Sequence, residues 1–324
     1  METQQEANLE KSHTGGLPVP FSLDLFRNFD VSSVAAEPVE PVDSLFGRYG
    51  GRCLLLRNAL SAEECALLIR GTSGDLEPVR YRRDYRRNDR CIYDSPELAE
   101  LLWRRVERAC RDLAVHADRA RQRLLKPPER QEQWEPHADD CPDELQLAIG
   151  QEGTWRPVGL NECLRFCRYE AGGFFRAHTD GCFCRSEEER SLFTCMFYLD
   201  GALEGGATRF LRPDAHMEFG DLGPAGEDQV LASVAPRAGQ CLLFFQPGLL
   251  HEGAELLSGV KHILRTDVMC RRDPDSRPRL TPQQAEALDL LRRAQEAEER
   301  CECDRAVELY RRAFKLDRRL ERMC

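Results

Sequence analysis

The chain has very little lysine and no long apolar run. Only four of its 46 basic residues are lysines, at positions 11, 126, 261 and 315. No stretch of about 18 apolar residues occurs, which excludes a membrane-spanning helix. Residues 1–5 are polar, with no basic start and no apolar stretch behind them, so we expect no ordinary secretory signal peptide. The formal net charge of −10 argues against a protein that coats nucleic acid through bulk charge.

Cysteine, by contrast, is frequent, because the 324 residues include 15. In a secreted chain so many cysteines would indicate disulfides. Without a signal peptide, reduced thiols are the better interpretation, and we expect a cytoplasmic protein, with the nucleus as the alternative. Hydrophobic residues make up 41% of the chain and charged residues 31%, so we expect a folded core rather than a wholly disordered chain.

Composition and periodicity divide the chain into three predicted segments. Residues 1–45 hold several glycine and proline breakers and little periodicity, which favours a mobile leader. Residues 46–275 form the main domain, in which short strands from about 155 to 272 are typical of a sandwich, jelly roll or barrel. Residues 276–324 have the pattern of a tetratricopeptide-like helical hairpin, which has to pack on the main domain or on a protein partner. The expected fold class is α+β.

Two supporting helices are predicted ahead of the strands. Ser61 and Glu64 form a capping box at the start of the first helix. The second helix begins at Ser95, which precedes a proline, and ends before Pro127. Between the two helices, residues 80–90 contain six arginines, two aspartates and two tyrosines. We interpret this segment either as a solvated hairpin or loop, or as a flap that faces a substrate or cosubstrate pocket.

Three of the seven histidines begin a His-x-Asp motif, at positions 116, 137 and 178. Two ligands at i and i+2 share a face only on a strand. His116 falls near the end of the predicted second helix, and His137 lies in a polar stretch where no strand is expected. His178 lies on an extended segment. Only His178 and Asp180 are therefore expected to meet at one ion.

A third ligand is expected from a distant part of the chain. His251 follows an apolar strand and a turn, and it is the leading candidate, while His216 and His262 are its rivals. Two histidines and one carboxylate on one face of an octahedral site suit non-haem Fe(II). Such a site leaves positions open for a chelating organic acid and dioxygen.

Lys261 is the candidate partner for the far carboxylate of such an acid. It lies ten residues after His251, on the last predicted strand. Lys261, Ile263 and Arg265 share one face of that strand, and His262 points to the other face. Because His262 points to the opposite face from Lys261, it is a weaker candidate for the third metal ligand. A buried ammonium is costly unless it meets an anion, and a dicarboxylate is such an anion.

The stretch from residue 161 to residue 270 resembles the iron(II)- and 2-oxoglutarate-dependent dioxygenase superfamily, in its prolyl 4-hydroxylase-like branch. The strong part of the resemblance covers about a third of the chain, and a looser part reaches back to about residue 46. The matching motifs are Tyr169-x-x-Gly172, Phe174-Phe175-Arg176-Ala177-His178-Thr179-Asp180, Phe197-Tyr198-Leu199-Asp200, Gly205-Gly206-Ala207-Thr208-Arg209-Phe210, and His251 with Lys261 ten residues on.

The resemblance implies a double-stranded β-helix core, which is a jelly roll. It implies Fe(II), 2-oxoglutarate and dioxygen as cofactor and cosubstrates, and ascorbate as a further requirement. By carry-over, His178, Asp180 and His251 bind Fe(II). Lys261 binds the distal carboxylate of 2-oxoglutarate, and Arg265 is the alternative for that role.

The resemblance also assigns two tyrosines and shows one departure. Tyr198 sits where related hydroxylases place a tyrosine that hydrogen-bonds the same distal carboxylate, and Tyr169 sits where several place a tyrosine near the cosubstrate. Core packing is the alternative role for both. The departure is Phe175, where prolyl 4-hydroxylases often carry tyrosine, and the lost hydroxyl affects how substrate or cosubstrate is bound.

The function expected from the residues and the resemblance is hydroxylation of a C–H bond in a protein side chain, with prolyl as the first guess and with release of succinate and CO₂. A protein or peptide is the expected substrate, and no membrane partner is expected. The alternatives are hydroxylation of a small metabolite, oxidative demethylation of nucleic acid, and a catalytically silent scaffold whose C-terminal hairpin binds a protein partner. The net charge and the lysine at position 261 weigh against nucleic acid.

Overall fold

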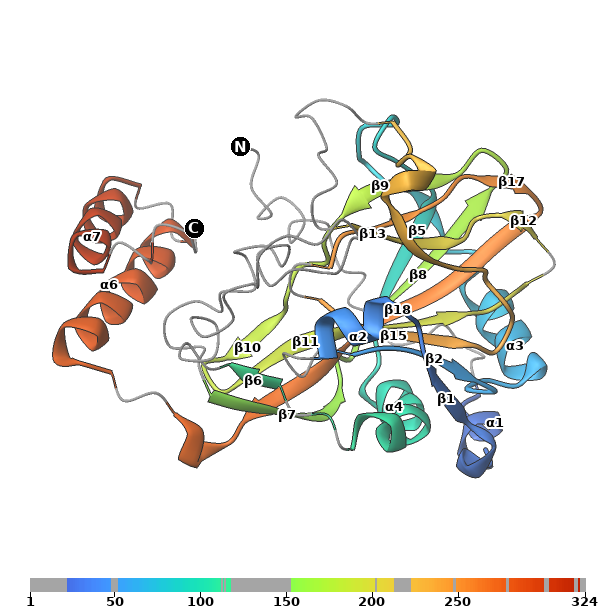
Figure 1. Ribbon diagram of the computed structural model, residues 1–324, viewed down its shortest axis with the longest axis horizontal. Helices are drawn as coiled ribbons and strands as arrows, with labels where there is room; N and C mark the ends of the chain where they lie inside the picture. The colour runs from blue at the N-terminus through green and yellow to red at the C-terminus, as the bar shows by residue number, and fades with distance from the viewer. Residues whose placement is uncertain are drawn as a thin grey trace, which may run out of the picture.

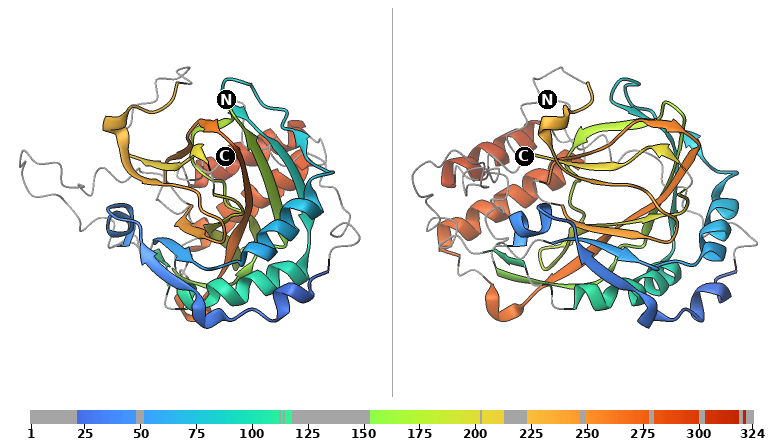
Figure 2. Two further views of the ribbon diagram at one scale, coloured as in Figure 1. Left: turned by 90° about the vertical axis from the view of Figure 1, so that its right-hand side faces the viewer. Right: turned by 45° about the vertical axis from the view of Figure 1, so that its right-hand side comes forward.

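The chain folds around two β-sheets that lie face to face, with helices on the outside (Figure 1, Figure 2). The structure is a computed structural model. It describes residues 22–47, 52–111, 113, 115–117, 153–201, 203–212, 223–246, 249–277, 280–299, 303–317 and 320.

Eleven strands of the described residues form the larger sheet, and every neighbouring pair in it is antiparallel. Its main path runs β1-β2-β15-β11-β18-β8-β5-β3. The strands are β1 (Ala35–Pro38), β2 (Cys53–Arg57), β3 (Glu77–Pro78), β5 (Asp89–Asp94), β6 (Val115–Ala117), β7 (Gly153–Leu160), β8 (Cys163–Glu170), β10 (Cys184–Ser186), β11 (Glu189–Tyr198), β15 (Cys241–Phe245) and β18 (Val260–Arg272).

Five further described strands form the smaller sheet, in the order β14-β13-β16-β9-β4. Rings of the two sheets meet in the core, where Phe210 of β13 and Phe244 of β15 have centroids 5.3 Å apart. The strands of the smaller sheet are β4 (Arg86–Arg87), β9 (Phe174–His178), β13 (Thr208–Leu211), β14 (Val230–Val234) and β16 (His251–Gly253), and β12 (Glu204–Gly205) pairs with β17 (Leu256–Ser258) beside them.

The predicted α+β class with a double-stranded β-helix core is confirmed by this architecture. Strands β2 (Cys53–Arg57) and β15 (Cys241–Phe245) form where short apolar runs predict them. The helices are α1 (Asp24–Arg27), α2 (Val42–Gly47), α3 (Ala62–Thr72), α4 (Pro96–Cys110), α6 (Pro282–Glu299) and α7 (Cys303–Leu316).

Helices α3 and α4 support the larger sheet from outside (Figure 2). Ser61 caps α3, and the capping box with Glu64 forms as predicted. Glu64 also makes a bidentate ion pair with Arg105 of α4, at 2.6 and 2.8 Å, and both side chains are 1% exposed. Leu98, Leu102 and Val106 bury the apolar face of α4 in the same core as the strands.

Two predicted boundaries are wrong. The second helix ends at Cys110 rather than before Pro127, because Val115–Ala117 pair with β7 as strand β6 instead of continuing the helix. The predicted leader over 1–45 is too long. Residues 24–47 hold α1, β1 and α2, and Phe26 and Val42 are buried in the core. Residues 1–21 of that leader lie outside the described residues.

The C-terminal helices α6 and α7 lie against each other as an antiparallel pair (Figure 1). Thr281 and Gln284 form the predicted capping box, with hydrogen bonds of 2.9 and 3.3 Å. The buried residues of the pair make an apolar cluster of their own, separate from the main core, which consists of Ala287, Leu290, Leu291, Ala294, Ala297, Ala306, Leu309, Ala313 and Leu320. Among the described helices, none combines the length and apolar character needed to cross a membrane.

Candidate metal centre

The two strands that carry the candidate histidines are neighbours in the smaller sheet. Strand β9 ends at His178, β16 begins at His251, and these two residues face each other directly in the antiparallel register. Asp180 follows β9 by two residues. Sheet pairing therefore brings together residues that are far apart in the chain.

Side-chain distances at this corner fit a single metal ion. One ligand atom from each of His178, Asp180 and His251 lies within 4.8 Å of the other two. Asp180 Oδ1 is 3.8 Å from His178 Nε2, and Asp180 Oδ2 is 3.6 Å from His251 Nε2. Neighbouring ligands of one ion, with bonds of roughly 2 Å, lie about 3 Å apart. Two imidazoles and one carboxylate are the donor set that suits non-haem Fe(II) with open positions.

Each histidine is oriented by its other ring nitrogen. Nδ1 of His178 is 2.7 Å from the Arg176 carbonyl oxygen, and Nδ1 of His251 is 3.0 Å from the Leu249 carbonyl oxygen. An Nδ1–H that donates to a carbonyl leaves the Nε2 lone pair free for a metal. Burial lowers the pKa of both histidines, which favours the neutral, ligating form.

Asp180 is held in its ionised form by its neighbours. Burial acts to raise the pKa of this carboxyl, but the charge of Arg265 and the hydrogen bond from Thr194 help to lower it below its ordinary value. Arg265 Nη2 lies 2.9 Å from Asp180 Oδ1, and the Thr194 hydroxyl donates to Asp180 Oδ2 at 2.6 Å. An ionised carboxylate is the form that binds a metal.

Aromatic rings pack against the two histidines of the cluster. The Phe175 ring stacks on His178 with centroids 3.6 Å apart, and the Phe244 ring lies edge-on to His251 at 4.8 Å. In the sequence, Phe175 stands out because related proteins often have tyrosine there. In the structure, its ring packs on His178. Such packing fixes the rings and limits access of water.

Lys261 lies on β18 opposite Tyr169 of β8 and is 4% exposed. Its Nζ donates to the Gly206 carbonyl oxygen at 2.5 Å and lies 5.3 Å from the Tyr169 ring centroid and 5.8 Å from that of Tyr198. Burial lowers the pKa of Lys261 to about 8. Among the described residues, no carboxylate pairs directly with this buried ammonium, which leaves it able to bind an anion.

The two tyrosines of the motif are both buried beside Lys261. The Tyr198 hydroxyl is 2.8 Å from Thr208 Oγ1, and burial raises its pKa. Burial likewise raises the pKa of Tyr169, to about 12. Both hydroxyls are therefore protonated at neutral pH and can donate a hydrogen bond.

Arg265 is placed differently from Lys261, although both lie on the same face of β18. Its guanidinium contacts Asp180, and it lies 3.5 Å from Asp267 Oδ1. Asp267 in turn accepts a hydrogen bond from Gln246 at 2.8 Å and pairs with Arg165 at 3.3 Å.

Two residues that support the cluster, Asp267 and Thr194, are not predicted from the sequence. The period of two that links Lys261 and Arg265 also reaches Asp267, and this is the signal that was available for it.

The other histidines do not join this cluster within the described part of the chain. His262 Nδ1 is 2.6 Å from Asp200 Oδ2, so the rival ligand on β18 has its own partner. His116 lies on strand β6, not on the predicted helix. His137 and His216 lie outside the described residues.

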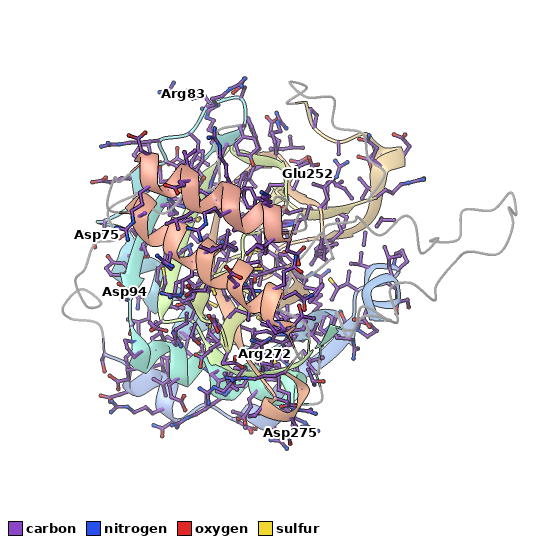
Figure 3. The ribbon with its side chains drawn as sticks, turned by 90° about the vertical axis from the view of Figure 1, so that its left-hand side faces the viewer. Asp75, Arg83, Asp94, Glu252, Arg272 and Asp275 are labelled. Atoms are coloured by element: carbon purple, nitrogen blue, oxygen red, sulfur yellow. The ribbon has the colours of Figure 1, made fainter. Side chains whose placement is uncertain are left out.

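The arginine-rich segment 80–90 runs beside the metal centre. Its strand β4 pairs with β9, with Arg86 opposite Phe175, and the Arg176 amide donates to the Tyr85 carbonyl at 2.9 Å. Arg83 lies at the outer tip of the segment (Figure 3). The tip of the segment is exposed, while Arg86 is buried beside the Phe175 ring that stacks on His178.

Comparison with known proteins was made by sequence and by structure. A search of curated proteins gave no match. Among solved structures, the chain is similar to the viral collagen prolyl hydroxylase of Paramecium Bursaria Chlorella virus-1 with 2OG (17% identity, 68% of this chain and 96% of that chain, TM-score 0.37). It is also similar to a Pseudomonas putida prolyl-4-hydroxylase (18% identity, 71% of this chain and 97% of that chain, TM-score 0.38). A third similar structure is a Trichoplax adhaerens prolyl hydroxylase in complex with a hypoxia inducible factor peptide fragment (14% identity, 72% of this chain and 88% of that chain, TM-score 0.39).

The sequence model of the 2OG-Fe(II) oxygenase superfamily matches residues 164–266. This span contains His178, Asp180 and His251, which the fold brings together, and also Lys261. The family uses Fe(II), 2-oxoglutarate and dioxygen, as the resemblance of the motifs implies. Within residues 164–266, the chain therefore matches the 2OG-Fe(II) oxygenase superfamily and carries its candidate metal cluster.

Proposed function

We propose that this protein is a dioxygenase that hydroxylates a C–H bond of a protein side chain, with proline as the first candidate. The observation that carries the proposal is the pairing of a His-Asp-His cluster with a buried lysine inside one matched family segment. His178, Asp180 and His251 would hold Fe(II). With dioxygen and 2-oxoglutarate, the bound iron supplies the oxidising power to hydroxylate an unactivated C–H bond while 2-oxoglutarate leaves as succinate and CO₂.

The surrounding residues bind and orient the cosubstrate in this proposal. Lys261 pairs with the distal carboxylate of 2-oxoglutarate, and Tyr169 and Tyr198 border the same position through their ring faces and hydroxyls. We propose Lys261 rather than Arg265 for this contact, because Arg265 is already paired with Asp180. Phe175 and Phe244 pack on the two histidines and limit the entry of water.

The proposal is tested by iron content and by succinate release. The purified chain, loaded with Fe(II) under nitrogen, is expected to bind about one iron and to form succinate from 2-oxoglutarate in air. His178→Ala and Asp180→Ala are expected to lose both properties. His262→Ala is the matched control, because His262 pairs with Asp200 outside the cluster, and it is expected to keep its iron.

The substrate class is tested by a mass-spectrometric search for +16 Da sites that depend on His251. Modified prolyl or other side chains support the protein-substrate proposal. If the iron-loaded protein binds no 2-oxoglutarate and forms no succinate, the silent scaffold is the correct interpretation. Salt-dependent binding in a gel shift would favour nucleic acid instead.

We also propose that residues 276–324 form a separate helical unit from the main domain at 46–275. The separate apolar cluster of α6 and α7 supports this division. A chain that ends at residue 275 is then expected to release succinate at the rate of the full chain. Loss of its thermal unfolding transition would show instead that the hairpin belongs to the main domain.

A further inference from the structure

Two cations that are more than nine-tenths buried have no carboxylate within 4 Å among the described residues. They are Lys261, 4% exposed, and Arg86, 9% exposed. The other two arginines buried to this degree, Arg105 and Arg272, pair with Glu64 and Glu188. A buried charge without a counter-ion is costly, so its retention indicates an anion that binds there.

Among the described residues, the hydrogen-bond acceptors and rings that contact the Arg86 guanidinium carry no charge. Its Nε donates to Asn88 Oδ1 at 2.6 Å, and Nη2 donates to Cys167 Sγ at 3.6 Å. The guanidinium carbon lies 4.3 Å from the Phe175 ring centroid and 5.8 Å from that of Tyr81. These contacts orient the guanidinium and use only part of its five N–H donors, and none of them neutralises its charge.

Arg86 is separated from the candidate metal ligand His178 by a single aromatic ring. The Phe175 ring on which its guanidinium packs is itself stacked on His178. The pairing of β4 with β9 fixes this position through the backbone.

Two buried carboxylates at the centre already have basic partners. Asp180 pairs with Arg265, and Asp267 pairs with Arg165. In the proposed function, one carboxylate of 2-oxoglutarate goes to the metal and the other to Lys261. Arg86 is then left without an anion, and the substrate is the component that has not yet been placed.

We propose that Arg86 forms a carboxylate-binding subsite for the substrate, so that the preferred substrate is an acidic peptide with an Asp or Glu side chain next to the residue that is hydroxylated. This inference rests on the proposed function. It adds a recognition element for the substrate that the metal cluster and Lys261 do not supply. A guanidinium suits this role because it binds a carboxylate through two parallel hydrogen bonds.

The test is a binding measurement that does not need turnover. The full chain, loaded with Fe(II) and 2-oxoglutarate under nitrogen, is titrated into two end-blocked, fluorescently labelled peptide libraries centred on proline. One library carries Asp and Glu at the flanking positions, and the other carries Asn and Gln there. Charge-assisted hydrogen bonds of this kind are worth about a tenfold preference or more for the acidic library.

Arg86→Gln is expected to remove that preference, and Arg86→Lys to keep part of it, because a lysine retains the charge but not the paired hydrogen bonds. Arg83→Gln is the matched control, since it removes one charge from the exposed tip of the same segment (Figure 3), and it is expected to bind like the original chain. Thermal unfolding of each variant reports folding, and Arg86→Lys keeps the test available if Arg86→Gln does not fold.

Three results would overturn the inference. They are equal binding of both libraries by the original chain, an unchanged acidic preference in Arg86→Gln, and a loss of 2-oxoglutarate affinity in Arg86→Gln that matches the loss of peptide affinity. The third would assign Arg86 to the cosubstrate. Free carboxylic acids such as N-acetyl-aspartate are added as competitors, and competition as strong as that of the peptides would be a fourth such result, because it would assign the subsite to a small acid. Failure of the proposed function itself is separate, because it shows as absent succinate release.

Discussion

Arg265 Nη2 lies 2.9 Å from Asp180 Oδ1, so the carboxylate of the candidate metal cluster is fixed by a guanidinium on the larger sheet. The same guanidinium lies 3.5 Å from Asp267, which is 1% exposed. Thr194 holds the other oxygen of Asp180. Asp180 lies beyond the end of β9, and these contacts from β11 and β18 take the place of strand pairing in fixing it.

Arg265→Gln is therefore expected to weaken iron binding by about 10–100-fold, which is typical when a partner of a metal ligand is removed. The Fe(II) dissociation constant, measured by competition with a chelator, checks this. Arg168→Gln is the control, because Arg168 pairs with Asp89 away from the cluster. Equal iron affinity in the original chain and Arg265→Gln would show that Asp180 needs no such support.

Binding of 2-oxoglutarate is expected to depend on the protonation of Lys261. Burial lowers the pKa of this lysine from 10.5 to about 8. The ammonium is thus present below pH 8 and is lost above it, and we expect the affinity for 2-oxoglutarate to fall by about tenfold per pH unit above that point. Dissociation constants measured from pH 7 to 9.5 check this.

Lys261→Arg keeps its charge over that range and is expected to flatten the pH profile, while Lys261→Ala lowers the affinity by about 100-fold at pH 7. The same pKa has a consequence for stability. Between pH 8 and 10.5 the unfolded chain holds the lysine proton and the folded chain does not, so the contribution of Lys261 to the free energy of unfolding rises with pH. A falling contribution would contradict the assignment.

The buried ion pair between α3 and α4 is expected to be a main contributor to stability. Arg105→Ala leaves Glu64 charged and buried, which costs about 3–5 kcal/mol. Arg104→Ala, one residue earlier on α4, breaks an exposed pair with Glu100 and is expected to cost less than about 0.5 kcal/mol. Urea unfolding of both variants measures the difference, and similar costs would refute this reasoning.

Gly206 links the turn before β13 to the lysine. Its φ is +69°, and a Cβ there would lie 3.0 Å from Leu256 Cδ1 and 3.4 Å from Lys261 Cδ. Gly206→Ala is thus expected to destabilise the fold by about 1–2 kcal/mol and to weaken 2-oxoglutarate binding. Calorimetry on folded protein separates the two effects, and unchanged affinity would mean that Lys261 does not depend on this turn.

The sequence predicts the features that depend on local patterns. The capping boxes at Ser61 and Thr281 form as expected because they need residues only three apart. The spacing predicts that His178 and Asp180 lie close together, although distant contacts from Arg265 and Thr194 hold Asp180, and the place of Lys261 follows from alternation along a strand. Each of these depends on neighbours in the chain.

The features that the sequence does not predict depend on pairing between distant segments. The ends of the second helix and of the leader are set by β6 pairing with β7 and by β1 pairing with β2. The partner of Arg265 and the burial of Arg86 depend on register across two sheets. The six arginines within residues 80–90 indicate a positively charged segment, but the sequence does not show which of these side chains is buried.

The pairing of β4 with β9 links two events that occur in different parts of the site. Arg86 and His178 sit on strands that share backbone hydrogen bonds, and the Phe175 ring lies between their side chains. In the proposed function, a peptide carboxylate bound by Arg86 would lie one ring contact from a ligand of the metal. Substrate recognition and metal binding would then share one pair of strands.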